Sequence, residues 1–370
     1  MTWRWRSPLL VGVVTAMILA ACGGGTTSEA PSSAASVPPA SAAPAGSDEP
    51  SASGEAVATL SPDGEPVTLQ LLASWAEGSV FAEPAERFVE EVEARSGGRV
   101  TIEYDGPDVV PFTEGMTALA NGVYDIHYNV PLYHTGIVPA GEAIYFISGE
   151  SSCQEYRDAG ALDIYDEIHR ETAGVMFLGC GGGGAHGATF LLQEPISTID
   201  ELEGLTFRGF GLYTRVLDVL GASSVAMPPG DVYGAIERGV IDGAAFPNLG
   251  IVEFGLHEVA PYLVMPPYLP FRYGFYMNPD SFDGLPADVQ TFLQETLWDL
   301  EDEFDAYYVE QRDAEAIELA ELGVEEVRLP QAESDRLETI IRDELWAFIE
   351  EAHPELGPQL REAFEAVEGS

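Results

Sequence analysis

Residues 67–73 read VTLQLLA, a short and mostly apolar run that is typical of a buried β-strand. The segment that follows carries apolar side chains at helical spacing over 81–92, and a Gly-Gly pair at 97–98 ends that pattern. The alternating stretch VTIEY at 100–104 then predicts a second strand. Strands that alternate with helices in this way indicate a mainly parallel sheet and an α/β protein.

The same alternation continues toward the C-terminus. It predicts helices at 114–120, 154–171, 213–220 and 232–238, and strands at 124–128, 175–178 and 205–209. Four glycines, 181–184, interrupt this pattern and are typical of a flexible crossover or, alternatively, of a backbone that approaches an anion closely. The periodic stretch at 286–323 predicts one helix of about 54 Å, at about 1.5 Å per residue. Because such a helix is longer than one small domain is wide, we expect it to brace two.

The N-terminus has the composition of an export signal. Two arginines precede an apolar run, 8–21, which is too short to span a bilayer. The run ends in Leu-Ala-Ala-Cys at 19–22, which resembles a bacterial lipobox and implies cleavage before Cys22 and acylation of its sulfur. An ordinary signal peptide with an incidental cysteine is the alternative. We therefore expect residues 1–21 to be a lipoprotein signal peptide, and the mature protein to be exported and lipid-anchored to the outer face of the cytoplasmic membrane.

The residues that follow have the composition of a linker. From Cys22 to about residue 65 the chain is almost wholly Gly, Ser, Ala, Pro, Thr and acids, with no aromatic side chain. Such a segment buries too little apolar surface to offset the entropy lost on ordering. Residues 22–65 are therefore predicted to be a disordered linker after the lipidated cysteine.

The charge balance excludes one large class of partners. The 370 residues include 62 Asp and Glu against 16 basic residues, all of them Arg, for a formal net charge of -46. Nothing in such a chain neutralises a row of phosphates, so a nucleic-acid binder is excluded. The acid-rich, lysine-free composition indicates adaptation to high salt, although a GC-rich genome also replaces Lys by Arg.

Several stretches follow one another in the order seen in one family of transport proteins. They are FVEEVEARSGGRV at 88–100, EGMTALANGVYD at 114–125, IDELEGLTFR at 199–208, LGASSVAM at 220–227, VYGAIERGVIDG at 232–243 and LPADVQ at 285–290. In these stretches the body, roughly residues 66–345, resembles the solute-binding proteins of TRAP transporters, of the DctP type. The resemblance implies an α/β, periplasmic-binding-protein-like fold of two lobes joined by hinge strands, with the long C-terminal helix bracing both.

The resemblance also implies a division of the chain and a function. Residues 66–184 and about 273–312 would form lobe I, and residues 185–272 and about 313–370 would form lobe II with the bracing helices. Such a protein captures an organic acid outside the cytoplasmic membrane and delivers it to the small and large TRAP permease subunits, which use an ion gradient. A binding protein of an ABC importer or of a sensor system is the nearest alternative.

Arg208 is the first candidate for contact with the ligand. In the family, an arginine at the end of the GLxxR strand pairs with a carboxylate of the ligand, and Arg208 occupies that position here. A planar guanidinium binds a carboxylate through two parallel hydrogen bonds and stays charged at any relevant pH. The alternative is a structural ion pair with one of the many acids of the chain.

Other positions depart from the family pattern. Many relatives carry a second arginine where this chain has His186, which would either donate a hydrogen bond to a ligand or pack at the hinge. The family signature DGxExP lacks its Glu here, at 242–247, and Phe246 stands where Asn is common. We therefore expect Phe246 to form an apolar wall and keep Asn248 as a candidate for the missing amide. These changes favour a monocarboxylate with an apolar or aromatic body over a dicarboxylate.

Four further residues are candidates for the lining of the cleft. Trp75 follows the first strand and would line the cleft or belong to the core. Glu114 and Tyr133 lie on neighbouring loops, where cleft residues are expected. Arg272 lies near the expected second hinge and is a reserve partner for a carboxylate.

The remaining cysteines suggest a disulfide. Once Cys22 is lipidated, Cys153 and Cys180 remain as a pair in a compartment that favours oxidation. A bridge between them would close a loop of about 27 residues. Two free buried thiols are the alternative.

Motifs of enzymes are absent from the sequence. It contains no GxSxG elbow and no HExxH motif, and its six histidines lack metal-ligand spacing. The glycines 181–184 lack the Lys-Ser/Thr end of a P-loop. We therefore expect a non-enzymatic protein without cofactor or metal, and a secreted hydrolase is the remote alternative.

Overall fold

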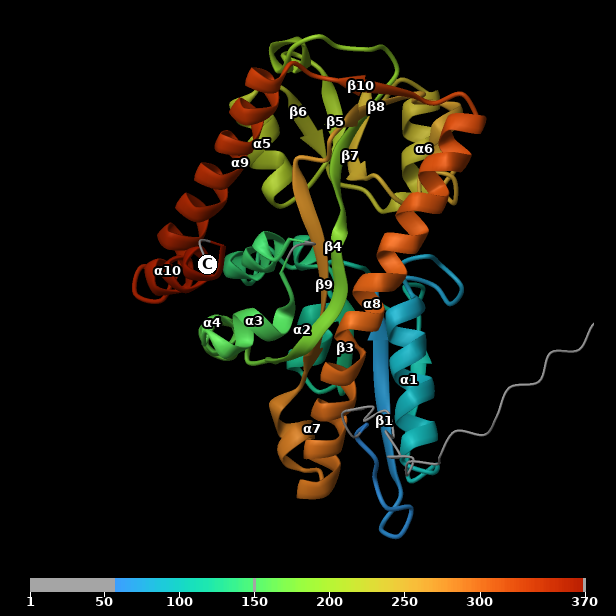
Figure 1. The fold of residues 1–370 in the computed structure, drawn as a ribbon, viewed down its shortest axis with the longest axis vertical. Coiled ribbons are helices and arrows are strands. Elements are labelled where there is room, and N and C mark those ends of the chain that lie inside the picture. The colour runs from blue at the N-terminus through green and yellow to red at the C-terminus, as the bar shows by residue number, and fades with distance from the viewer. Residues whose placement is uncertain (1–56, 149–150, 369–370) are drawn as a thin grey trace, which may run out of the picture. The chain divides into compact units, whose positions relative to one another are not determined.

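The computed structural model describes residues 57–148 and 151–368 (Figure 1). The predicted signal peptide, Cys22 and most of the predicted linker lie outside the described residues. The last part of that linker, residues 57–65, packs against the body instead of leaving it. Ala58 and Leu60 are buried, and the backbone N–H of Ala58 donates to a carboxylate oxygen of Asp299 at 2.9 Å. Residues 57–65 therefore belong to the described body, ahead of the strand that begins at Val67.

The first sheet region forms as the alternation of the sequence predicts. Strand β1 (Val67–Ala73) lies between β2 (Val100–Asp105) and β3 (Ile126–Asn129) and pairs in parallel with both. Helix α1 (Glu83–Arg95) makes the crossover and buries its apolar face, including Phe88, against the sheet. These strands and their helices are called lobe I below.

Two long antiparallel strands, β4 (Met176–Leu192) and β9 (Leu269–Met277), connect lobe I to the rest of the body (Figure 1). Strand β9 pairs with β3, and the far end of β4 pairs with β7 of the second sheet region. The glycines 181–184 lie within β4, where the pairing with β9 shifts register between Cys180 and Gly183 and again between Gly183 and Gly187. They interrupt the regular pairing of the strand without ending it. A side chain at Gly183 would collide with the backbone of Phe271, which explains why the closely paired strand needs glycine there.

The second sheet region, called lobe II, contains short strands and their helices. They are β5 (Thr206–Arg208), β6 (Ser223–Val225), β7 (Gly243–Pro247), β8 (Tyr262–Met265) and β10 (Glu325–Arg328), with helices α5 (Leu212–Val219) and α6 (Pro229–Glu237). Strand β5 lies between β6 and β7 and pairs in parallel with both. Strand β8 pairs with the end of β4 and with β10.

The long helix predicted near the C-terminus is α8 (Ala287–Glu321), which has 35 residues and packs along β4 and α1. Near its end, the carboxylate of Glu315 accepts the backbone N–H groups of Gly250 and Val252, at 2.6 and 2.8 Å, from a loop of lobe II. Helix α9 (Gln331–Ala352) then returns along α5 and stacks Trp346 on Phe146. The prediction that a long C-terminal helix braces both lobes is therefore confirmed.

The remaining elements are short helices. They are α2 (Gly115–Ala120), α3 (Cys153–Asp158), α4 (Ala161–Ala173), α7 (Pro279–Asp283) and α10 (Gly357–Glu368), and the 3-10 turns η1 (Pro131–Tyr133), η2 (Pro139–Phe146), η3 (Ile199–Leu202) and η4 (Leu256–Glu258). The single helix expected at 154–171 is two helices, because Gly160 adopts a left-handed conformation, with φ of 76°, between α3 and α4. Among the described residues, no helix combines the length and the apolar character needed to cross a membrane.

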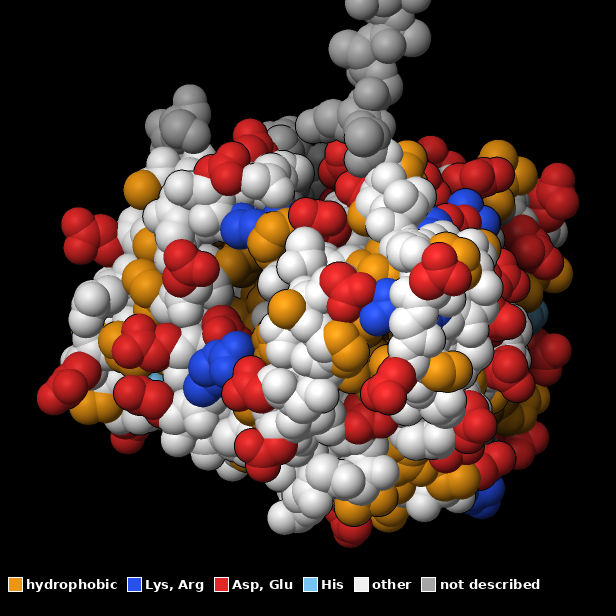
Figure 2. All heavy atoms as spheres, turned by 90° about the horizontal axis from the view of Figure 1, so that it is seen from below, with side chains coloured by type: hydrophobic (Ala, Val, Ile, Leu, Met, Phe, Trp, Pro, Cys, Tyr) orange, Lys and Arg blue, Asp and Glu red, His pale blue; other side chains and the backbone are white. Residues whose placement is uncertain are grey.

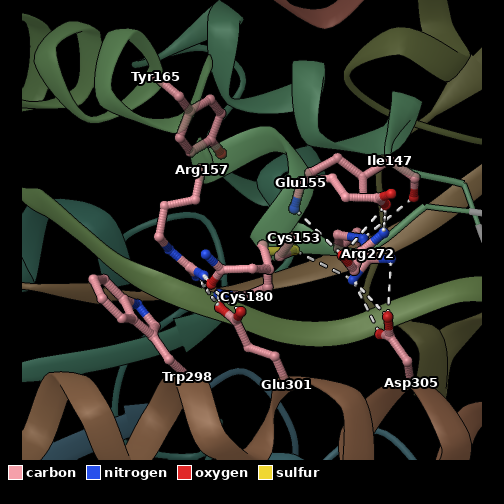
Figure 3. Close-up of a disulfide and its surroundings, with 12 residues drawn as sticks. Ile147, Cys153, Glu155, Arg157, Tyr165, Cys180, Arg272, Trp298, Glu301 and Asp305 are labelled. Carbon is pink, nitrogen blue, oxygen red and sulfur yellow. Dashed lines mark hydrogen bonds and ion pairs between the residues drawn. A yellow bond between two sulfur atoms is a disulfide. The ribbon is translucent and has the colours of Figure 1, made fainter. Parts of the chain in front are cut away.

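Cys153 and Cys180 form a disulfide that joins α3 to the hinge strand β4 (Figure 3). Their sulfurs lie within 4.8 Å of a carboxylate oxygen of Glu301, but sulfurs bonded to each other offer no thiolate to a metal. Glu301 instead accepts two hydrogen bonds from Arg157, at 2.7 and 2.8 Å, and one from the backbone N–H of Cys180. The bridge is thus held beside a buried ion pair.

The disulfide is expected to contribute measurably to stability. In the chain-entropy account, a bridge that closes this loop adds about 3 kcal/mol to the free energy of unfolding. We expect Cys153→Ser to lower the unfolding free energy, measured by urea denaturation, by that amount. Thiol titration of the unfolded Cys22→Ser variant without reductant checks the bridge itself. It should find no reactive thiol, and two thiols would contradict the structure.

The surface of the body is acidic. Figure 2 shows acidic side chains spread over the face that it presents, with few basic ones among them. Most arginines are engaged with neighbouring acids, such as Arg87 with Glu91 and Arg170 with Asp166. A buried cation without an acidic partner is therefore unusual in this protein.

Candidate ligand-binding site

A small cavity of about 30 Å³ lies where the ends of strands from both lobes meet the hinge. It is lined by Trp75, Phe81, Val130, Leu132, Tyr133, Arg208, Pro229, Phe246, Pro247, Phe271 and Tyr273. A space of this size holds roughly one or two water molecules. A second hollow, of about 460 Å³, shares Trp75, Tyr133 and Pro229 with the cavity. The cavity beside Arg208 is itself too small for an organic ligand unless its walls move apart, and the larger hollow adjoins it.

Arg208 ends β5 and lies in the wall of this cavity with only 2% of its surface exposed. The carboxyl ends of parallel strands are where ligands of α/β proteins bind, and β5 brings the arginine there. Its guanidinium donates to the backbone oxygens of Ala245, at 2.9 Å, and Met227, at 3.3 Å. The Tyr133 hydroxyl lies close enough to interact electrostatically with the guanidinium.

No carboxylate of the described body lies within ion-pair distance of Arg208. The structural ion pair considered as the alternative role for this arginine therefore has no partner there. Burial lowers the pKa of Arg208, but a guanidinium stays protonated in proteins. The cavity wall thus contains a desolvated positive charge without a counter-charge, which is costly unless an anion joins it.

Aromatic rings surround this charge. The carbon at the centre of the Arg208 guanidinium lies 4.4 Å from the ring centroid of Phe210 and 5.3 Å from that of Phe246. Among the other lining residues, Trp75 contacts Tyr133 and Tyr273, with ring centroids 6.0 and 5.2 Å apart. The structure places Trp75, Tyr133 and Phe246 at the cavity, as the sequence predicts. Their part in binding stays a prediction.

His186 and Asn248 lie behind the cavity wall. His186 is buried, and its Nε2 shares a hydrogen bond of 2.8 Å with the hydroxyl of Tyr273, which does line the cavity. Burial, with the charges of nearby arginines, lowers the pKa of His186 to about 3, so the ring is neutral. Asn248 accepts the backbone N–H of Gly187 at 2.8 Å, which fixes the hinge. Of the two roles considered for His186, packing at the hinge agrees with this position.

Glu114 and Arg272 do not line the cavity. Glu114 is exposed, precedes α2 and lines none of the hollows described above. Arg272 is fully buried and donates to both carboxylate oxygens of Asp305 in α8, at 3.0 and 3.2 Å, and to the backbone oxygen of Ile147 (Figure 3). Successive side chains of β9 alternate between faces, so Phe271 and Tyr273 face the cavity while Arg272 faces α8. Asp305 thus occupies the guanidinium that the sequence offers as a reserve partner for a ligand carboxylate, and this position does not favour that role.

Several residues of the site were missed at the level of the sequence. Phe271 and Tyr273 belong to the mostly apolar run of β9, for which no strand is predicted from the sequence. Phe81 is part of the predicted helical pattern at 81–92, but it lies before α1 and lines the cavity. Tyr213 and Tyr268 also lie close enough to Arg208 for electrostatic interaction, and their buried hydroxyls have no hydrogen-bond partner among the described residues. Buried hydroxyls without partners beside an unpaired cation indicate a site where a polar ligand would supply the missing hydrogen bonds.

Comparison with known proteins identifies the relatives of this chain. The sequence model of the DctP family, described as bacterial extracellular solute-binding protein, family 7, matches residues 72–351. The ectoine/5-hydroxyectoine-binding periplasmic protein UehA of Ruegeria pomeroyi is 22% identical over 281 residues, which are 74% of this chain and 78% of UehA. A solute-binding protein of Sulfitobacter is 31% identical over 127 residues, but the match spans 38% of that relative.

A solved structure shares the fold. The TRAP transporter solute-binding protein of Bordetella bronchiseptica, with copurified calcium and picolinate, superposes with a TM-score of 0.73 at 20% identity. The match covers 83% of this chain and 94% of that protein. The prediction of a two-lobed fold with hinge strands is confirmed by this likeness and by the pairing of β4 and β9.

Proposed function

The chain belongs to the bacterial extracellular solute-binding proteins of family 7, and we propose that it captures a small organic acid through Arg208. The single observation that supports this role is the buried guanidinium in a cavity wall with no acidic partner in the described body. A ligand carboxylate would supply the missing counter-charge and accept two parallel hydrogen bonds. No sequence motif or structural feature described above favours catalysis.

The lining of the cavity suggests the class of ligand. Arg208 is the single charged side chain among the residues that line it, and the others are apolar or aromatic. A second carboxylate would therefore be buried without a cation, which is costly. We propose a ligand with one carboxylate and a flat or apolar body that packs between Trp75 and Phe246. The picolinate of the Bordetella protein is a carboxylate of this kind.

Delivery and anchoring complete the proposal. The family assignment supports transfer of the captured acid to the small and large membrane subunits of a TRAP transporter. Acylation at Cys22 would hold the protein at the outer face of the cytoplasmic membrane, and the linker would let the body reach the subunits. The division of the chain into lobe I and lobe II at the residues given above belongs to the same proposal. Genes for two membrane subunits beside this one would support it, whereas a gene for an ATPase would favour an ABC importer.

Thermal-shift screening with matched pairs of compounds tests the proposed function. Each pair contains a monocarboxylate and its primary amide, so that the two differ chiefly in the charge that Arg208 would recognise. We expect at least one acid to raise the melting temperature, since at about 100 times its Kd a ligand adds about 2.7 kcal/mol to stability. The matching amide should have no effect. Amides as effective as their acids, or turnover of the compound without a partner protein, would contradict the proposal.

A further inference from the structure

Glu142 is a buried acid of lobe I that contacts the chain of lobe II. It lies in η2, which precedes the hinge strand β4 in the chain, and its side chain is fully buried. The backbone N–H of Leu212, the first residue of α5, donates to both of its carboxylate oxygens at 3.2 Å each. The hydroxyl of Thr135 donates to one of them. Within the described body no cation lies within ion-pair distance of Glu142.

The segment that Glu142 holds carries the proposed ligand contact. Only residues 209–211 separate Arg208, at the end of β5, from Leu212. Gly211 has a positive φ of 58°, and a side chain there would have its Cβ 2.6 Å from Oε1 of Glu142. The loop therefore lies directly on the carboxylate. The ring centroid of Phe210, in the same loop, lies 4.4 Å from the guanidinium carbon of Arg208. A shift of the loop would therefore move the ring against which the arginine packs.

We infer that Glu142 is a latch between the lobes and a positioning residue for Arg208. When the lobes are together, its carboxyl group accepts hydrogen bonds from the N-terminus of α5. This contact fixes the loop 209–211, which directly follows Arg208. When they separate, Gly211 and Leu212 no longer cover the carboxyl group, and water reaches it. The part concerning Arg208 rests on the proposed function, whereas the latch itself does not.

Protonation of Glu142 should strengthen this latch. Burial raises the pKa of Glu142 from 4.5 to about 7, although the hydrogen bonds from Thr135 and Leu212 and the charge of Arg215 oppose the shift. A solvated carboxyl group returns toward its ordinary value, so the latched state binds the proton more tightly than the open state. By linkage, the latched state is favoured at low pH and loses stability as pH rises from about 4.5 through about 7.

The other titratable groups that face Glu142 do not compete over this range. Three of them are tyrosines whose pKa burial raises well above 10; they are Tyr145 in η2, Tyr165 in α4 and Tyr213 in α5. Arg215 of α5 is paired with Glu344 of α9 at 3.4 Å. His134, beside Thr135, is neutral because burial lowers its pKa well below 6.5. A change in the loop between pH 5 and 8 therefore reports on Glu142.

Hydrogen exchange of the peptide that covers residues 209–215 tests the latch without any ligand. Protection factors, corrected for intrinsic exchange, are measured at pH 5 and pH 8 on the purified full-length protein. We expect protection in the wild type to fall by at least about tenfold between pH 5 and pH 8. Glu142→Gln keeps the size of the side chain but does not titrate, so its protection should be independent of pH. Glu142→Ala should be poorly protected at both values.

The matched control is Glu344→Gln, the same substitution on the other side of Arg215, which should retain the wild-type pH profile. A wild-type profile without pH dependence, or a Gln variant that keeps the wild-type dependence, would overturn the inference. The wild type and the Gln variant decide the question even if the Ala variant does not fold. If no acid of the screening panel binds, the proposed function fails, and the exchange result still decides the role of Glu142.

Discussion

Replacing Arg208 by alanine is expected to weaken binding of a carboxylate ligand more than about a hundredfold. The substitution leaves the ligand's charge buried and unpaired, which costs about 3 kcal/mol, and each 1.4 kcal/mol is about a factor of ten in Kd. Arg208→Lys should not restore binding, because an ammonium group cannot form the two parallel hydrogen bonds of a guanidinium. Isothermal titration with the acid identified by thermal shift measures both variants.

The fold should survive the loss of Arg208. Since no carboxylate of the described body pairs with it, truncation leaves only the backbone oxygens of Ala245 and Met227 without a donor. We expect a change in unfolding free energy of about 1–2 kcal/mol. Arg328→Ala, at an exposed ion pair with Glu326, is the control and should change neither property. Binding by Arg208→Ala within threefold of wild type, or failure of this variant to fold, would defeat the assignment.

The opposite result is expected for Arg272, the fully buried arginine of the hinge strand β9. Arg272→Ala leaves Asp305 without its cation and removes the donor to Ile147, and breaking a buried pair typically costs about 3–5 kcal/mol. Urea denaturation should therefore show a large fall in the unfolding free energy. Any variant protein that remains folded should bind the ligand with nearly the wild-type Kd.

A second substitution on the same pair separates charge from side-chain packing. Asp305→Asn keeps the shape of the side chain and should destabilise the protein less than Arg272→Ala, because the amide oxygen still accepts a hydrogen bond. The account of Arg272 would be wrong if its alanine variant had wild-type stability and lost ligand binding, since this would make the residue a ligand contact.

Much of the fold could be predicted because it depends on local periodicity. The strand at Val67–Ala73 is a mostly apolar run, and in α8 buried side chains recur at three- and four-residue spacing from Val289 to Tyr308. The glycines 181–184 could not be placed in the same way. Glycine lowers local strand propensity, and the segment is part of a strand only through its irregular pairing with β9, in which Gly182, Gly183 and Gly184 have positive φ. That pairing joins residues about 90 positions apart, which no local pattern reveals.

The position of a candidate site residue could be predicted when that residue ends a strand. Arg208 closes β5, so the topology alone brings it to the cleft. The role of Arg272 could not be predicted from the residue type, because a guanidinium binds a ligand carboxylate and the carboxylate of Asp305 equally well. Only the face of β9 from which the side chain projects distinguishes the two roles. Glu142 was not predicted, since its partner Leu212 belongs to the other lobe and the sequence around it shows no motif.

The central claim is that the ligand's carboxylate binds Arg208. A crystal structure of the protein with the tightest-binding acid of the screening panel tests it most directly, through the distance between the carboxylate oxygens and the guanidinium nitrogens. We predict two parallel hydrogen bonds of about 2.8 Å to Arg208, with the body of the acid between Trp75 and Phe246. A carboxylate that faces solvent, or that pairs with another cation while Arg208 stays as described here, would contradict the account.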